Sequence, residues 1–335
     1  MPLITGRQAV LDVYADMERR GWVMPCFCSE NQTSTEAILA ATLEASVRLK
    51  CPDLPVTIAM TNLYSHRSQS VAYTQTGRWD IGLKLFLADL RILTEASSPY
   101  GALRVLVHLD HIQPDADHDL LNWDLGQFSS IMYDASTLPF EQNIERTRRF
   151  MREQGHKLVV EGACDEIVDA GGKECNALTT PERAMEYVKG SGVDFIVANL
   201  GTEHRASAAE LTYHGDLARQ ISKAVGGRLV LHGSSSVSHD QIRYLFRDGV
   251  RKVNVWAAIE RDSSPALLAD MVRNAAKVAG PKVARTLKEE GLLGPKCNTD
   301  MPAALSHYTT TYRQELVFGQ MKQIVGRFLD LWMTP

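Results

Sequence analysis

Short apolar segments alternate with longer amphipathic segments along most of the chain. The apolar segments are almost uniformly hydrophobic, which is typical of strands buried on both faces of a parallel sheet. We predict eight strands, over residues 22–27, 55–61, 103–110, 130–134, 157–161, 195–200, 228–232 and 252–256. Each strand precedes a segment with helical spacing of apolar residues, and we predict helices over residues 31–49, 80–96, 115–123, 140–154, 181–189, 214–224, 238–246 and 264–278.

Eight successive strand–helix units predict an α/β fold closed as a (β/α)8 TIM barrel. A doubly wound sheet is the alternative, but no Gly-x-Gly-x-x-Gly follows the first strand to support dinucleotide binding. A helix over residues 5–20 is expected ahead of the first strand. The alternation ends near residue 280. We therefore predict a barrel domain over residues 1–280 and a C-terminal helical extension over residues 281–335, packing on the barrel or on a partner subunit.

Composition refines this prediction mainly by exclusion. Acidic and basic residues are interspersed and give a formal charge of -4, so no basic face is available for nucleic acid or an anionic membrane. No apolar run reaches the roughly 18 residues that a membrane span needs. The six cysteines lack paired metal-ligand spacing, which favours free thiols in a reducing compartment. We expect a cytoplasmic protein whose partner is a small molecule, with no nucleic-acid or membrane partner.

Three of the predicted strands lead into a histidine: His111, His204 and His232. One such histidine is more often structural, but the carboxyl ends of parallel barrel strands meet at one mouth. Three imidazoles that leave positions open for substrate are the ligand set of a catalytic zinc site. Because side chains alternate along a strand, Asp110 and His111 can both face the mouth only where the strand has ended. Asp110 would then lie beside the metal, free for proton transfer.

Two predicted loops are long and polar. The connection over residues 164–180 carries Gly171-Gly172 and is longer than an ordinary connection between a strand and a helix, so it resembles a mobile active-site flap. The connection over residues 64–78 is similarly long.

Several motifs together resemble one enzyme family. The motifs are His108-Leu109-Asp110-His111, the stretch from Met132-Tyr133-Asp134 to Asn143-Ile144, Gly201-Thr202-x-His204, Leu231-His232-Gly233 and Lys252-Val253-Asn254-Val255. In order and spacing they are similar to the signatures of the class II fructose-bisphosphate and tagatose-bisphosphate aldolases. The likeness extends from about residue 2 to residue 279, and the stretch over residues 134–144 is its most specific part.

The resemblance implies a zinc ion held by His111, His204 and His232 that polarises the carbonyl of dihydroxyacetone phosphate. It implies acid/base catalysis by Asp110, and it leaves room for a monovalent cation. Asn254 matches the asparagine that holds the enediolate, and Glu174 matches the glutamate that moves a proton on the donor carbon.

Two further acids, Asp134 and Glu161, match positions near the metal. They are expected to orient a histidine or to act as secondary ligands. For Asp134, a helix or turn cap is an equal alternative.

The chain departs from the family pattern where phosphate would bind. Arg205 and Ile112 replace glycines that follow two of the zinc histidines, and the run Gly233-Ser234-Ser235-Ser236 replaces a glycine-rich phosphate cradle. Trp256 and Ala257 follow Asn254 where an acidic or small residue and a threonine are usual. Glycines let backbone amides approach an anion, so their loss disturbs a phosphate nest. We infer that the reaction type is kept and that the substrate has changed.

The substrate contacts are predicted from the same loops. Arg205 is expected to hold a carboxylate, a sulfonate or a repositioned phosphate, or else to pair with Glu203 or Glu210. The predicted substrate-binding set is Gly201, Arg205, Gly233, Ser234, Ser235, Asn254 and Trp256.

The leading hypothesis is a zinc-dependent aldolase that cleaves a ketose, with a ketose phosphate or bisphosphate as the expected substrate, in a dimer or tetramer of identical chains. A substrate that is unphosphorylated or acidic, and a barrel acting as a non-catalytic partner subunit, are the alternatives. A Schiff-base aldolase needs a lysine at the mouth. Lys157 and Lys252 begin their strands, so we expect them at the opposite end of the barrel.

Overall fold

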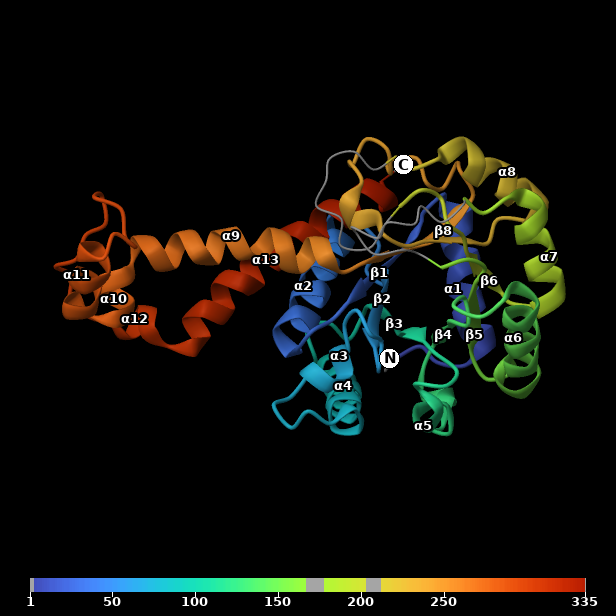
Figure 1. Cartoon of the computed structure of the whole chain (residues 1–335), viewed down its shortest axis with the longest axis horizontal. Helices are drawn as coiled ribbons and strands as arrows, with labels where there is room; N and C mark the ends of the chain where they lie inside the picture. The colour runs from blue at the N-terminus through green and yellow to red at the C-terminus, as the bar shows by residue number, and fades with distance from the viewer. Residues whose placement is uncertain (1–2, 167–177, 203–211, 335) are drawn as a thin grey trace.

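The computed structural model describes residues 3–166, 178–202 and 212–334 (Figure 1). Eight parallel strands follow one another around a closed barrel, and β8 pairs with β1 to complete it. The predicted TIM barrel is confirmed. The strands are β1 Met24–Cys28, β2 Pro55–Thr61, β3 Arg104–Ile112, β4 Ser130–Tyr133, β5 Val159–Ala163, β6 Phe195–Val197, β7 Leu229–Leu231 and β8 Val250–Val255.

Helices surround the barrel and extend beyond it. They are α1 Arg7–Arg20, α2 Gln32–Arg48, α3 Gln69–Ala72, α4 Trp79–Leu93, α5 His118–Leu121, α6 Phe140–Gln154, α7 Pro181–Ser191, α8 Gly215–Val225, α9 Ala257–Arg273, α10 Ala275–Ala279, α11 Pro281–Glu289, α12 Leu305–Tyr308 and α13 Thr310–Met333, with short 3-10 turns η1 Leu125–Gln127 and η2 Ser234–Ser236. Asn31 explains why α2 begins at Gln32. Its side chain accepts the amide hydrogen of Ser34, while the Ser34 hydroxyl accepts the amide hydrogen of Asn31, a reciprocal cap at the start of α2.

The helix predicted over residues 238–246 is wrong, because that segment forms a series of turns. Its backbone bonds include turns that join residues three apart, such as Gln241 N to Ser238 O and Arg247 N to Tyr244 O, and the indole Nε1 of Trp332 donates to the carbonyl oxygen of Ile242 at 3.0 Å. The helix predicted over residues 264–278 begins earlier, at Ala257, and Pro265 lies inside it. The pair Ser264-Pro265 resembles a helix start, but the helical pattern already extends before it.

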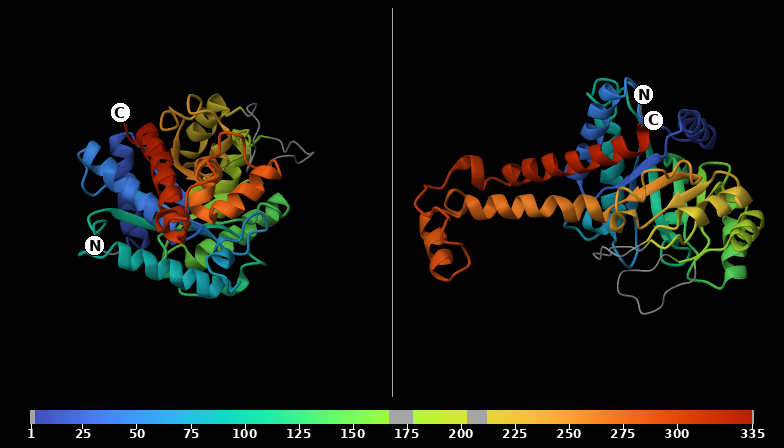
Figure 2. Two further views of the ribbon diagram at one scale, coloured as in Figure 1. Left: turned by 90° about the vertical axis from the view of Figure 1, so that its left-hand side faces the viewer. Right: turned by 90° about the horizontal axis from the view of Figure 1, so that it is seen from above.

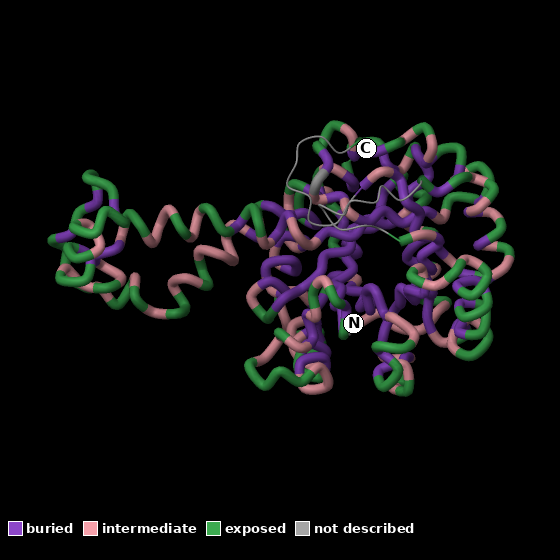
Figure 3. Tube along the Cα trace, viewed as in Figure 1, coloured by how far each residue is buried: buried purple, intermediate pink, exposed green. Residues whose placement is uncertain are grey.

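A two-helix arm projects from the barrel (Figures 1 and 2). α9 leads out and the first part of α13 leads back beside it, with α10, α11 and α12 at the tip. The tip holds a small apolar cluster of its own, formed by Ala275, Ala276, Ala284, Leu293 and Cys297. Most of the arm is exposed or half-buried, in contrast to the barrel (Figure 3).

The second part of α13 returns to the barrel and packs against α2 and β1. Its apolar face over residues 321–333 is buried in the main core, where Phe328 and Trp332 stack with ring centroids 5.1 Å apart. The backbone amide of Val23 donates to the carbonyl oxygen of Trp332 at 3.3 Å, next to the start of β1. The last helix therefore covers the first strand. Within the described residues, no helix has the length and apolar character needed to cross a membrane.

Candidate active site

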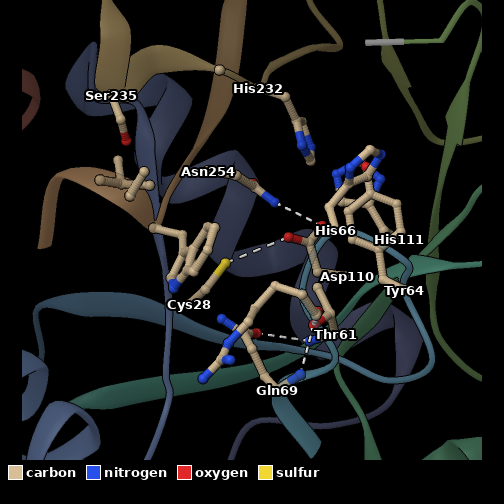
Figure 4. A pocket seen from close by; sticks show the side chains of 15 residues that line it. Cys28, Thr61, Tyr64, His66, Gln69, Asp110, His111, His232, Ser235 and Asn254 are labelled. Atoms are coloured by element: carbon tan, nitrogen blue, oxygen red, sulfur yellow. Dashed lines mark hydrogen bonds between the residues drawn. The ribbon is translucent and has the colours of Figure 1, made fainter. Parts of the chain in front are cut away.

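A pocket of about 560 Å³ opens at the carboxyl ends of the barrel strands (Figure 4). β1, β2, β3, β7 and β8, with the loops that follow them, supply its walls. The lining residues are Cys28, Thr61, Tyr64, His66, Arg67, Gln69, Asp110, His111, His232, Gly233, Ser235, Asn254, Val255, Trp256 and Ala257. It is at this end of a TIM barrel that enzymes place their active sites.

A bulge in β3 brings two consecutive residues into this pocket. The register between β3 and β4 shifts between Leu109 and Ile112, and His111 has a φ of 49°, in the left-handed region. Such a conformation is uncommon for a residue other than glycine and re-aims the side chain. Asp110 and His111 both line the pocket although β3 continues to Ile112. The expectation that the strand must end for both to face the mouth is therefore wrong, since a bulge achieves the same result.

The His111 ring is fixed from two sides. Its Nδ1 lies 2.8 Å from Oδ2 of Asp134, and the Tyr64 ring stacks on it with centroids 4.3 Å apart and an angle of 6° between the planes. Asp134 also accepts hydrogen bonds at Oδ1 from the amide and the hydroxyl of Ser136, so this carboxylate is a turn cap as well. A carboxylate that takes the Nδ1 hydrogen of an imidazole leaves Nε2 as the metal-binding atom.

His232 meets His111 edge to face. Their ring centroids are 4.9 Å apart and the planes are at 84°. The Thr202 hydroxyl donates to the carbonyl oxygen of His232 at 2.6 Å, which ties β7 to the end of the β6 segment. Ligand atoms of Asp110, His111 and His232 all lie within 4.8 Å of one another, and all three side chains are buried. Two imidazole nitrogens and a carboxylate oxygen at this spacing fit a divalent ion such as zinc.

Asp110 is held by donors on both oxygens (Figure 4). Asn254 donates from Nδ2 to Oδ1 at 3.0 Å, and the Cys28 thiol donates to Oδ2 at 3.4 Å. Burial by itself would raise the pKa of Asp110, but His111, His108 and His232 outweigh it and hold that pKa well below its usual range. Burial, together with Asp110, raises the pKa of the Cys28 thiol. The carboxyl group is therefore ionised and the thiol keeps its hydrogen.

Below Asp110 lies a buried ion pair. The ammonium of Lys252 lies 2.7 Å from Oε1 and 2.8 Å from Oε2 of Glu161, and 3.1 Å from Nε2 of His108. All three side chains are fully buried inside the barrel. The prediction that Lys252 faces the opposite end is wrong, because its long stem points inward and upward from the strand. Burial alone would lower the pKa of Lys252, but Cys26, Glu161 and Asp110 around it raise that pKa. Because Lys252 is bonded to Glu161 and lies outside the pocket lining, it is no Schiff-base nucleophile.

Comparison with known proteins identifies the family to which this chain belongs. Residues 8–311 match the model of the family described as class-II fructose-bisphosphate aldolase. The chain belongs to that family. The resemblance seen in the sequence motifs is therefore confirmed, and the protein is a lyase of the class II aldolase type.

Individual relatives agree with the family match. The sulfofructosephosphate aldolase of Alkalicoccus urumqiensis is 32% identical over 263 residues, which are 76% of this chain and 80% of the relative. A fructose-bisphosphate aldolase structure from Campylobacter jejuni aligns with a TM-score of 0.75 and 17% identity, over 99% of this chain and 95% of that one. A putative fructose-1,6-biphosphate aldolase from Coccidioides immitis aligns with a TM-score of 0.65 and 20% identity, over 96% and 95%. At such low identities the two structures support the fold alone.

The predicted site residues of this class II aldolase fall into three groups. Asp110, His111, His232, Asn254, Gly233, Ser235 and Trp256 line the pocket. Asp134, Glu161, Ser234 and Gly201 lie outside its lining. Asp134 bonds His111, Glu161 binds Lys252, Ser234 donates its hydroxyl to the carbonyl oxygen of Asn254 at 2.9 Å, and Gly201 occupies a turn with a φ of 87°. His204, Arg205 and Glu174 lie outside the described residues.

Sequence reasoning missed one whole wall of the pocket. Thr61, Tyr64, His66, Arg67 and Gln69 line it from the segment after β2, and Cys28 lines it from β1. The long polar connection over residues 64–78 is the feature of the sequence that points to this wall, but it does not tell which of its residues face the pocket.

Glu30 holds part of this wall in place. Arg67 donates from Nε to Oε2 of Glu30 at 2.9 Å and Gln69 donates from Nε2 to Oε1 at 3.1 Å. Arg67 is the one lysine or arginine in the described part of the lining.

Proposed function

We propose that this class II aldolase uses one zinc ion, held by His111, His204 and His232, to cleave a ketose phosphate reversibly into dihydroxyacetone phosphate or dihydroxyacetone and an aldehyde. The observation that carries the proposal is the convergence of ligand atoms from Asp110, His111 and His232 within 4.8 Å at the floor of the pocket. His204 would complete the ligand set, and a monovalent cation beside the substrate stays a prediction. When bound, zinc supplies Lewis-acid polarisation of the substrate carbonyl.

Asp110 is proposed as the acid/base group. In the cleavage direction its carboxylate takes the proton from the substrate hydroxyl next to the breaking bond, and in the synthetic direction it returns that proton. Its place in the pocket lining, buried beside the imidazoles of His111 and His232, supports this role. Each carboxylate oxygen has a second lone pair, so the bonds from Asn254 and Cys28 orient the group and leave room for the substrate proton.

Asn254 is proposed to hold the oxygen that becomes negatively charged as the bond breaks. Its Oδ1 is buried and its Nδ2 bonds Asp110 from the β8 side of the pocket. An amide donor that is already oriented stabilises developing charge with little reorganisation. Glu174 is proposed, from the family pattern alone, as the group that moves the proton on the donor carbon.

The substrate is proposed to be a ketose phosphate with a second acidic group. The relative from Alkalicoccus urumqiensis is named for sulfofructose phosphate, so a sulfonate is the leading candidate for that group. Arg67 offers a guanidinium in the lining, and Gly233, Ser235 and Trp256 border the same space. Gly201, Ser234 and Arg205 stay predictions as substrate contacts.

A substrate panel tests the reaction. Zinc-loaded protein is incubated with sulfofructose phosphate, fructose bisphosphate, tagatose bisphosphate and unphosphorylated fructose, and the released aldehyde is trapped. We expect cleavage of at least one ketose phosphate, loss of that activity with a chelator, and recovery with zinc. Zinc-loaded protein that cleaves no ketose phosphate would contradict the proposal. A protein that binds no zinc and cleaves no sugar would instead support the non-catalytic subunit.

We also propose that the protein is a cytoplasmic homo-oligomer, either a dimer or a tetramer. Every cysteine among the described residues is free, which suits a reducing compartment. The arm exposes large apolar side chains, among them Leu268, Leu292 and Leu305 at 66%, 69% and 67% exposure. Such side chains on a projecting element are typical of a subunit contact. Analytical ultracentrifugation tests this assignment, and a monomer at micromolar concentration would contradict it.

A further inference from the structure

A second and larger cleft lies at the amino ends of β1 and β8, at the opposite end of the barrel from the active-site pocket. Its volume is about 1730 Å³. Three segments form it: the junction of α1 and β1, the turns before β8, and the end of α13. No part of the proposed aldol reaction uses this end of the barrel.

The charge of the cleft is opposite in sign to that of the chain. Its described lining holds four arginines, Arg20, Arg243, Arg247 and Arg327, against one acid, Asp330. That acid is already paired with Arg48, which lies outside the lining. The whole chain carries a formal charge of -4, so this is a local concentration of positive charge on an acidic protein.

Two of the arginines lack a carboxylate partner in the described part of the chain. The other two have one: Nε of Arg20 lies 3.2 Å from Oδ2 of Asp16, and Nη2 of Arg243 lies 4.0 Å from Oδ1 of Asp240, at the limit of an ion pair. Arg247 and Arg327 have no carboxylate oxygen within 4.0 Å among the residues described. Arg247 instead lies over the ring of Tyr244, 4.9 Å from its centroid, and Tyr244 is 52% exposed.

Helix ends explain only part of this charge. α1 and α13 both end at the cleft, and each helix C-terminus carries about half a negative charge that acts within the last turn. Arg20, in the last turn of α1, fits that role. The last turn of α13 contains no basic residue, and Arg327 lies six residues before its end. The charge of a helix end therefore does not explain why Arg243, Arg247 and Arg327 lie at the cleft.

The floor of the cleft is rigid. Trp332 is 3% exposed, its indole donates to the carbonyl oxygen of Ile242 at 3.0 Å, and its own carbonyl oxygen accepts from Val23 at 3.3 Å. One residue, through its side chain and its backbone carbonyl, thus joins all three segments. Charged groups carried on a fixed floor lose less freedom when they bind a ligand.

We propose that this cleft binds a small phosphorylated molecule. Guanidinium groups of Arg247 and Arg327 hold the phosphates through paired hydrogen bonds, and Tyr244 offers a face to a planar group. The site is separate from the active-site pocket and does not depend on the proposed reaction. Bound there, the ligand would link the end of α13 to the turns before β8, so occupancy would stabilise the closure of the barrel.

ADP is the probe, because it has two phosphates and a planar base. Calorimetric titration of the full chain, without divalent metal and at low ionic strength, is expected to show one ADP per chain at the cleft. Arg327→Gln and Arg247→Gln should each weaken binding by about 10-fold or more, the scale of a lost hydrogen bond between charged groups. Both residues are exposed, so both variants should fold. Arg149→Gln on α6, an exposed arginine outside the cleft, is the matched control and should bind like the unmodified protein.

Three results would overturn the proposal. The first is the absence of saturable binding. The second is binding that survives both cleft variants but is weakened by Arg67→Gln, which would place ADP in the active-site pocket. The third is a change of oligomeric state in Arg327→Gln without ADP binding, which would make the cleft an interface between copies of the chain.

Discussion

Two layers of buried ionisable side chains lie one above the other inside the barrel, and they differ in how their charges are satisfied. In the lower layer, Lys252 is paired with Glu161 and bonded to His108, and His108 Nδ1 lies 2.8 Å from the Ser130 hydroxyl. In the upper layer, Asp110, His111 and His232 turn ligand atoms toward one shared space. The opposite charges of Lys252 and Glu161 balance each other in the lower layer, whereas the upper layer gathers ligand atoms that could hold a metal ion.

The difference separates two uses of buried charge. A closed network costs desolvation energy that its own contacts offset, and it fixes the strands that carry it. A set of converging nitrogen and oxygen ligands needs an ion from outside to reach the same balance. The layers meet where His108 Nε2 lies 3.6 Å from Oδ1 of Asp110. The lower layer thus supports the side chain proposed to transfer the proton.

The largest effect is expected from the upper layer. His232→Ala should abolish zinc binding and turnover together, because it removes one of the converging imidazoles. Metal analysis after dialysis and an aldehyde-trapping assay measure the two quantities. His118→Ala, an exposed histidine on α5, is the control and should keep both. Full zinc occupancy with full activity in His232→Ala would rule out the site as drawn.

The lower layer should respond in stability. Lys252→Met leaves Glu161 as an unpaired buried charge, which should lower the free energy of unfolding by about 3–5 kcal/mol. Urea denaturation measures this loss. The double variant Lys252→Met with Glu161→Gln removes both charges and should recover most of it. Equal stability of the single and double variants would show that Glu161 is not left as an unpaired charge when Lys252 is removed.

Within the upper layer, Asp110 lies nearest to the lower one and should affect chemistry more than metal binding. Asp110→Ala should lower kcat by ~10²-fold or more, the usual scale for lost acid/base help, while zinc stays bound by the imidazoles. Steady-state kinetics and metal analysis of the same preparation give the two values. Unchanged turnover would assign the acid/base role to another group.

Glu260 extends the comparison to a half-buried acid at the start of α9 that belongs to neither layer. Burial, with Glu30 beside it, raises the pKa of Glu260 to about 7, and Arg67 offsets only part of this. The folded protein therefore holds this proton more tightly than the unfolded chain does. The stabilisation is complete below the unfolded pKa of about 4.3 and is lost as the pH rises through about 7.

Glu260→Gln removes that pH dependence. At pH 8.5 the variant should be more stable than the unmodified protein by about 2 kcal/mol, a value reduced from the full shift because the side chain is partly exposed. At ~pH 4.5 the two should be nearly equal. Urea denaturation at both pH values measures the difference, with the exposed Glu153→Gln as control. A gain of the same size at both pH values would show that titration is not its cause.

The barrel and much of its mouth could be predicted because they follow from periodic patterns. Uniform apolar strands give the closure, and residues at strand ends, such as Asp110 and His232, meet at one face wherever the strands are parallel. The direction of Lys252 could not be obtained that way. Its position near the start of β8 suggested the far end, but a long side chain that points inward can reach the next layer.

The conformations of loops and turns also could not be predicted from the sequence. Arg67 reaches the pocket because the segment after β2 folds back onto Glu30, a contact between residues 37 positions apart that no local pattern encodes. The turns over residues 239–249 have helical spacing of apolar residues, yet they are joined to Trp332, 90 positions away, whose indole donates to the carbonyl oxygen of Ile242. The bulge at His111 depends on pairing with β4 in the same way.

The return of α13 onto α2 and β1 has a consequence for how the chain is made. β1 is among the first segments to leave the ribosome, but its outer face is covered by residues 321–333, which leave more than 290 positions later. The eight strands are complete at residue 255, but until residues 321–333 follow, the outer side of β1 lacks its apolar cover. Completion of synthesis, rather than the local stability of any one strand, should therefore set the moment at which the first strand of the barrel becomes fully covered.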